Sequence, residues 1–392
     1  LEILTQPGER RLVHDYRLSM GIPLLAVLLA LSACAGLPVR GTVGGQVVDT
    51  RVDSEVARYY LGSYLAGNRS NPTLDARIDQ MDQAMDGHLP GRSDLQQLSE
   101  QFSIDFAALV LADRISRVPA NRRFRSVYEE AFAYASKTVP QGRAKLPAGA
   151  ERYEALLVPT YLYKRRFVQG ADLSEPRAAL EKVGLTCHFV ETSDDGPIES
   201  NAEIVMAAIR ARAQSGRRLI IISASKSGPE VALALTKLGP TETGNVAAWI
   251  NAVGALQGTP LIDDDVLPEL EFIVGKIDAA GVESMSAARS RKRFESFHVP
   301  ESVLVINFFG IPLTGSVSFR AARGFYPMKK HGPNDGMVLL SDMILPGGIT
   351  LTEVGSDHFL MDRHLDVTTV ALTTAIIRWL ENPPDGTSRR AP

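Results

Sequence analysis

Cysteine is nearly absent from this sequence, which contains only Cys34 and Cys187 among 392 residues. Two distant cysteines exclude a disulfide framework, so the fold must depend on its hydrophobic core. The formal net charge of −3, and the lack of a basic stripe interleaved with aromatic residues, argue against a nucleic-acid partner. A composition of 45% hydrophobic and 22% charged residues is that of a globular chain, long enough for one large domain and a smaller one.

An apolar run over residues 20–31 is too short to span a membrane comfortably. Three arginines precede it, which is the layout of a secretory signal: Arg10, Arg11 and Arg17. The run ends in Leu-Ser-Ala-Cys, residues 31–34, which resembles the lipobox of bacterial lipoproteins. The resemblance implies a signal peptide over residues 1–33 and acylation of Cys34. The acyl chains would anchor the protein to a membrane of the bacterial cell envelope, on its periplasmic or outer-membrane side. An ordinary signal peptide followed by a chance cysteine is the alternative.

The rest of the chain divides into segments of different periodicity. Residues 34–50, rich in Gly and Val, predict a tether, and residues 51–138 have the helical periodicity of a small all-α domain. After a Pro/Gly/Lys-rich linker, residues 139–150, strands alternate with helices over residues 151–383, which predicts an α/β fold with a parallel sheet covered by helices. The predicted strands cover residues 155–158, 185–191, 219–222, 246–253, 302–309 and 349–354. An insertion between two strands, residues 255–300, is long enough to form a lid.

The third of these strands leads into the most informative motif of the chain. Residues 219–222 form an apolar, β-branched run, and the pattern that follows them is helical up to Gly239. Between strand and helix lies Ser-Ala-Ser-Lys-Ser, residues 223–227, with small residues two before and two after Ser225. A nucleophile elbow needs this spacing, although glycine is usual where serine stands here at both flanking positions. The Ser225 hydroxyl is therefore a candidate nucleophile.

A serine nucleophile needs a base and a carboxylate that orients the base. His358 directly follows the last predicted strand, and the carboxyl ends of parallel strands line the ligand crevice of such sheets. Asp335, in an Asn-Asp-Gly turn between the serine and the histidine, is the predicted acid, with Asp342 as the second choice. Asp357 would have to fold back sharply to reach the adjacent ring, so we expect it to make hydrogen bonds within its own loop.

The oxyanion of an acyl-transfer intermediate needs backbone donors close to the nucleophile. The N–H of Lys226 follows Ser225 directly, and the turn after the first sheet strand would supply a second donor from Tyr161. The sequence does not specify where the Lys226 side chain points.

With this elbow, acid turn and histidine, the segment of residues 151–383 resembles the α/β-hydrolase superfamily, especially its bacterial lipase and esterase branches. The resemblance implies Ser225 as nucleophile, Asp335 as acid, His358 as base, and Tyr161 and Lys226 as oxyanion donors. A Pro-Thr dipeptide stands where His-Gly is usual at the end of the first strand. We therefore expect a membrane-anchored serine hydrolase that cleaves small-molecule or lipid carboxylic esters through an acyl-enzyme, with no metal and no cofactor.

Other interpretations of the same residues stay open. An acyltransferase would use the same side chains but would transfer the acyl group to another alcohol instead of water. A surface lipoprotein could also have kept the fold and lost the activity. Residues 223–226 also fit the S-x-x-K motif of penicillin-binding proteins and class A β-lactamases, but their S-D-N and K-T-G tripeptides are missing from the chain. A metal hydrolase would need ligands at an unusual spacing: His358, Asp362, His364 and Asp366.

Overall fold

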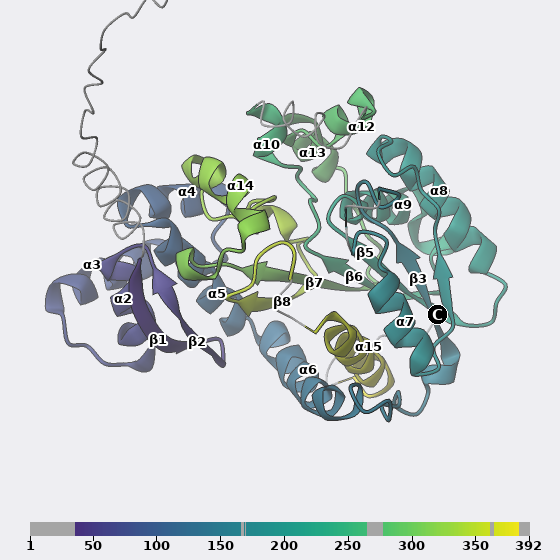
Figure 1. Cartoon of the computed structure of the whole chain (residues 1–392), viewed down its shortest axis with the longest axis horizontal. Helices are drawn as coiled ribbons and strands as arrows, with labels where there is room; N and C mark the ends of the chain where they lie inside the picture. Colours follow the sequence, from purple (N-terminus) through teal and green to yellow (C-terminus); the bar gives the residue numbers. More distant parts are fainter. Residues whose placement is uncertain (1–35, 166–167, 169, 265–276, 361–363, 384–392) are drawn as a thin grey trace, which may run out of the picture. The chain divides into compact units, whose positions relative to one another are not determined.

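The computed structural model describes residues 36–165, 168, 170–264, 277–360 and 364–383 (Figure 1). The predicted signal peptide and Cys34 lie outside these residues, as does part of the predicted insertion. The described residues from Leu37 onward form one compact unit. Among the described helices, none has the length and apolar character needed to cross a membrane.

Six parallel strands form the central sheet, in the order β4-β3-β5-β6-β7-β8. Strands β3 and β7 are buried along their whole length, as expected for strands covered on both faces. Each strand overlaps a predicted one, so the predicted α/β class and parallel sheet are confirmed. The strands are β3 (Tyr153–Val158), β4 (Cys187–Phe189), β5 (Arg218–Ala224), β6 (Val246–Ala252), β7 (Leu304–Ile311) and β8 (Ile349–Val354).

The two faces of the sheet pack into two separate cores, because successive side chains of a strand point to opposite faces. On β3, Leu156 belongs to one core and Leu157 to the other. Helices α6, α7 and α15 contribute to the core around Leu157, and α8 and α9 contribute to the core around Leu156 (Figure 1). These helices are α6 (Pro119–Thr138), α7 (Ser174–Lys182), α8 (Ile198–Arg212), α9 (Ser227–Glu242) and α15 (Leu365–Glu381).

Residues 37–52 form an antiparallel hairpin, so the tether predicted over residues 34–50 is wrong from Leu37 onward. Strands β1 (Leu37–Val43) and β2 (Gln46–Val52) are joined by Gly44 and Gly45, whose φ angles of 57° and 83° suit glycine. Four valines at alternating positions are buried on one face of the hairpin: Val39, Val43, Val48 and Val52. The Gly and Val content that indicated a tether hides this period-2 pattern, and the N-terminal part is consequently not all-α.

The helices predicted over residues 51–138 are present, but they do not form a separate domain. Phe106 and Tyr128 belong to the same core as Phe308 of β7, and the rings of Tyr128 and Phe308 lie 6.4 Å apart. The predicted domain boundary at the linker is therefore not a boundary of the core. The helices of this segment are α2 (Glu55–Gly62), η1 (Tyr64–Ala66), α3 (Pro72–Ala84), α4 (Arg92–Gln101), α5 (Ile104–Arg117) and α6.

Two long connections leave the sheet after β6 and after β7. The first contains α10 (Pro260–Asp263), α12 (Ala279–Ser284) and α13 (Ala287–Phe294). The second contains η3 (Thr314–Ser316), α14 (Phe319–Met328), η4 (Lys329–His331) and η5 (Leu340–Met343). Helix α10 contacts both α13 and α14. The lid role expected for residues 255–300 stays a prediction.

Candidate active site

Ser225 occupies a strained turn between β5 and α9. Its φ angle is +53°, in the left-handed region where a non-glycine residue costs roughly 1–2 kcal/mol. Three backbone hydrogen bonds hold this conformation: the Ser225 N–H donates to the Ala252 carbonyl (3.0 Å), and the Ser225 carbonyl accepts from the N–H groups of Gly228 and Ala255 (3.0 Å each). The neighbouring structure thus maintains the turn and exposes the Ser225 hydroxyl at the carboxyl end of β5.

The two serines that replace elbow glycines each satisfy a buried polar group. Ser223 Oγ accepts a hydrogen bond from the Trp249 indole N–H (2.8 Å), which otherwise lies in the core. Ser227 Oγ accepts from the Ala224 N–H and lies 2.9 Å from the Val158 carbonyl oxygen, so it connects the turn to β3. These departures from the usual pattern therefore stabilise the elbow.

His358 joins Ser225 to a carboxylate. Its Nε2 lies 3.1 Å from Ser225 Oγ, and its Nδ1 lies 2.7 Å from Asp335 Oδ2. His358 is 9% exposed and Asp335 is fully buried. Since an ionised carboxylate only accepts hydrogen bonds, the proton belongs on Nδ1, and the free Nε2 lone pair then faces the serine hydroxyl.

The loop around Asp335 fixes the position of the carboxylate. Asp335 Oδ1 accepts from the N–H groups of Met337 (2.9 Å) and Val338 (2.8 Å), which leaves Oδ2 for the histidine. The His358 N–H also donates to the Asp335 carbonyl oxygen (3.0 Å). The predicted acid and base are therefore held together through both backbone and side chain.

The other acid candidates have different partners. Asp342 is buried against Arg92, whose Nη2 and Nε lie 2.6 and 3.2 Å from its two carboxylate oxygens. Burial raises the pKa of Asp342, and the Arg92 charge opposes that rise. Asp357 accepts a hydrogen bond from the Phe359 N–H (3.0 Å) within its own loop, as predicted, and a second one from the Ser318 N–H (2.7 Å) of a different connection.

The two predicted oxyanion donors lie on well-fixed turns. Neither Tyr161 N–H nor Lys226 N–H donates a hydrogen bond to another described residue. The residues on either side of Tyr161 are held by the Thr160 N–H, which donates to Ala171 (3.0 Å), and by the Leu162 N–H, which donates to Asp194 (2.8 Å). Burial raises the pKa of the Tyr161 hydroxyl, and nearby carboxylates add to the rise.

The Lys226 side chain is buried and forms an ion pair with Glu230 one turn along α9. Glu230 Oε1 also accepts from Asn201 Nδ2 of α8 (2.8 Å). Burial raises the pKa of Glu230, and the Lys226 charge opposes the rise. The i,i+4 spacing of this pair is visible in the sequence and is a signal our sequence interpretation did not use. The Arg92 partner of Asp342, 250 positions away, has no such signal.

Among the described residues, no cluster of three His, Cys, Asp or Glu side chains could hold a metal ion, and Asp362 of the metal-site alternative lies outside those residues.

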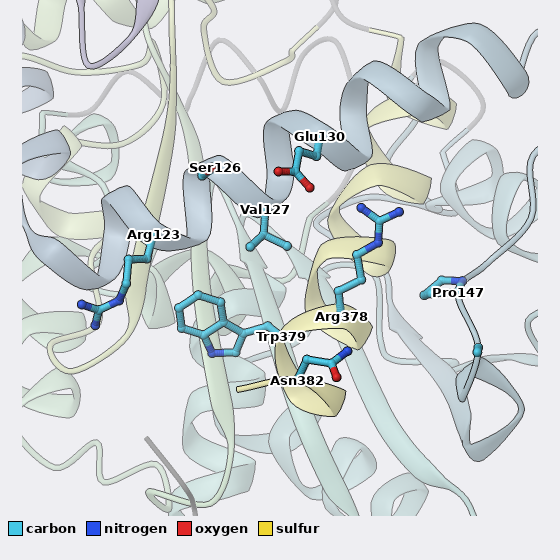
Figure 2. A pocket seen from close by; sticks show the side chains of 9 residues that line it. Arg123, Ser126, Val127, Glu130, Pro147, Arg378, Trp379 and Asn382 are labelled. Carbon is cyan, nitrogen blue, oxygen red and sulfur yellow. The ribbon is translucent and has the colours of Figure 1, made fainter. Parts of the chain in front are cut away.

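A surface hollow of 860 Å³ lies between α6, the 147–148 segment and the end of α15 (Figure 2). Arg123, Arg378 and Trp379 line it, and it shares no residue with the Ser225 site.

The fold and the site together define a class. A parallel α/β sheet with a serine elbow after one strand, an acid loop after a later strand and a histidine after the last strand is the organisation of the α/β-hydrolase fold.

Comparisons with known proteins were made by family model, by sequence and by structure, and the structural comparison finds similar chains. No family model and no curated protein sequence matches the chain. The crystal structure of a metagenomic carboxyl esterase is similar, with 22% sequence identity and a TM-score of 0.46 over 60% of this chain and 77% of the esterase. The mature lipase of Bacillus licheniformis is similar with 20% identity and a TM-score of 0.45, over 58% of this chain and 90% of the lipase. The fold class given above follows from the order and direction of the strands in the sheet, without these similarities.

Proposed function

We propose that this protein is a serine hydrolase of carboxylic esters that acts through an acyl-enzyme. The observation that carries the proposal is the contact series from Ser225 Oγ to His358 Nε2 (3.1 Å) and from His358 Nδ1 to Asp335 Oδ2 (2.7 Å). This is the geometry of an activated nucleophile with an oriented base.

The proposed reaction begins when Ser225 Oγ attacks the ester carbonyl carbon while His358 Nε2 takes the hydroxyl proton. The N–H groups of Lys226 and Tyr161 stabilise the resulting oxyanion, each by about 10²–10³ in rate, or about 3–4 kcal/mol. The tetrahedral intermediate collapses with loss of the alkoxide, which receives the proton from His358 and leaves as the alcohol. Water then attacks the Ser225 ester, His358 takes its proton and returns it to Ser225, and the carboxylic acid is released.

The lipobox-like sequence supports the location that we propose. Acylation of Cys34 would anchor the enzyme to the bacterial envelope, and its substrates would then be lipid esters or small esters that reach that membrane. Growth in labelled palmitate followed by purification tests this anchor directly, with Cys34→Ser as the variant that should lose the label.

Hydrolysis of p-nitrophenyl esters by the protein spanning residues 37–392 tests the proposed chemistry. Ser225→Ala and His358→Ala should each abolish turnover. His364 is an exposed histidine that precedes α15 as its N-cap, and His364→Ala should retain turnover. Turnover by the folded Ser225→Ala protein would contradict the proposal. No turnover by the unaltered protein would favour the inactive scaffold.

A further inference from the structure

One stretch of this weakly acidic chain carries positive charge that no acidic residue of the stretch offsets. Residues 302–334 contain four lysines and arginines and no aspartate or glutamate, although the whole chain carries a net charge of −3. The basic residues belong to α14 and η4: Arg320, Arg323, Lys329 and Lys330. Lys330 pairs with Asp264 (3.2 Å), whereas the other three form no ion pair with a described residue. Unpaired positive charge is therefore concentrated on one short helix and the turn that follows it.

The same helix exposes two aromatic side chains. Its inner face is apolar and buried, whereas Phe319 is 82% exposed and Tyr326 is 54% exposed on its outer side. The Arg323 guanidinium lies 5.8 Å from the Phe319 ring centre, and Lys329 Nζ lies 5.4 Å from that of Tyr326. Large aromatic side chains are seldom this exposed, and together with the neighbouring cations they suit a surface that is both apolar and negatively charged.

The inner side of α14 is attached to the loops of the proposed active site. The Ser318 N–H at its start donates to the carboxylate of Asp357 (2.7 Å), the residue before His358. In its middle, Gly324 packs so closely on the Gly336 carbonyl that an added Cβ would lie 1.9 Å from that oxygen. A surface bound to the outer side of α14 would therefore lie one helix thickness from the loops that hold the acid and the base.

We propose that the outer face of α14, formed by Phe319, Arg320, Arg323 and Tyr326 together with Lys329 at the start of η4, docks on an anionic lipid surface. Aromatic side chains insert at the boundary between headgroups and acyl chains, and each cation close to an anionic leaflet gains about fivefold in partition. A second copy of this chain is a poor occupant, because it would bring two sets of unpaired cations together. Lipid binding is independent of the chemistry at Ser225. The further idea that docking on lipid brings ester substrates to Ser225 rests on the proposed function.

Vesicle sedimentation tests the docking face. The protein spanning residues 37–392 carries Ser225→Ala, so that no vesicle lipid is hydrolysed, and is mixed with vesicles of phosphatidylcholine with or without 30 mol% phosphatidylglycerol. We expect binding that requires phosphatidylglycerol and weakens when salt rises from 50 to 500 mM. Arg320→Gln/Arg323→Gln should reduce the partition coefficient about 25-fold. Phe319→Ser/Tyr326→Ser should reduce it about tenfold or more.

Matched variants separate this face from general charge and from folding. Arg122→Gln/Arg123→Gln removes two exposed arginines from α6 and should leave partition within about twofold of the parent. Circular dichroism establishes that every variant is folded. Absence of binding, equal binding to neutral vesicles, or an equal loss in the α6 variant would each overturn the proposal. A dimer that forms without lipid and dissociates on Phe319→Ser/Tyr326→Ser would assign the face to a second copy and would also overturn it.

Discussion

The exchange of Asp335 for asparagine removes one charge from the site and almost no volume. The carbonyl oxygen of the new amide would replace Oδ1, which accepts from the Met337 and Val338 N–H groups, so the amide nitrogen would face His358 Nδ1 at the present 2.7 Å. Nδ1 would then have to accept a hydrogen bond. The ring proton would move to Nε2, which faces Ser225 Oγ, and the histidine could no longer take the serine proton.

The expected loss in kcat follows from this change in the tautomer of His358. The corresponding change in a serine-protease triad lowers kcat about 10⁴-fold, or about 5 kcal/mol of transition-state stabilisation. We expect Asp335→Asn to lower kcat by a comparable factor while KM stays within about threefold, because the carboxylate orients the base and does not bind the ester.

Asp342→Asn is the matched control, since it makes the same chemical change at the second candidate acid. It weakens the contact with Arg92, whose side chain is 24% exposed, and should lower the free energy of unfolding by about 1–3 kcal/mol. Its kcat should stay within about threefold of the parent. Steady-state hydrolysis of p-nitrophenyl butyrate, with urea unfolding of each protein, measures both quantities. If Asp335→Asn keeps more than a tenth of kcat, or if Asp342→Asn loses as much as Asp335→Asn, the assignment of the acid is refuted.

Other substitutions test the packing around the site and the pH dependence of stability. Glu230→Ala leaves the buried Lys226 ammonium without its carboxylate and should lower the free energy of unfolding in urea by about 3–5 kcal/mol. Glu230→Gln should lower it less, because the amide keeps a hydrogen-bond acceptor for the ammonium. Equal losses in the two variants would contradict the role of the pair. Ser223→Gly makes the elbow more like the usual pattern but removes the acceptor of the Trp249 indole, so we expect a loss of about 1–3 kcal/mol; a gain would refute this interpretation. Burial and the neighbouring Asp53 raise the pKa of Asp105 to about 7. The folded protein thus holds this proton more tightly than the unfolded chain, so the stabilisation is complete below about pH 4 and is lost as pH rises through about 7. Unfolding free energy should fall by up to about 4 kcal/mol between pH 4 and pH 8, and Asp105→Asn should remove most of that fall; an unchanged slope would contradict it.

The sequence predicts the sheet and the three side chains of the proposed triad because local patterns encode both. Buried strands appear as apolar runs, and the elbow needs small residues close to Ser225 along the chain. His358 and Asp335 are predicted from their place relative to the strands, and the structure places His358 against Ser225 and Asp335 against His358.

Features that depend on distant contacts cannot be predicted in this way. The core shared by Tyr128 and Phe308 joins segments that local periodicity cannot connect, so the predicted separation of the helical segment from the sheet is wrong. The Trp249 partner of Ser223 belongs to another strand, and the pairing explains a serine that departs from the usual elbow pattern.

Labelling of the protein spanning residues 37–392 with a fluorophosphonate, followed by peptide mass mapping, tests the central claim most directly, because the probe reacts only with an activated serine. The account predicts a single adduct on Ser225 that is lost in His358→Ala and kept in His364→Ala. An adduct on another serine, or no adduct on the folded protein with or without added lipid vesicles, would contradict it.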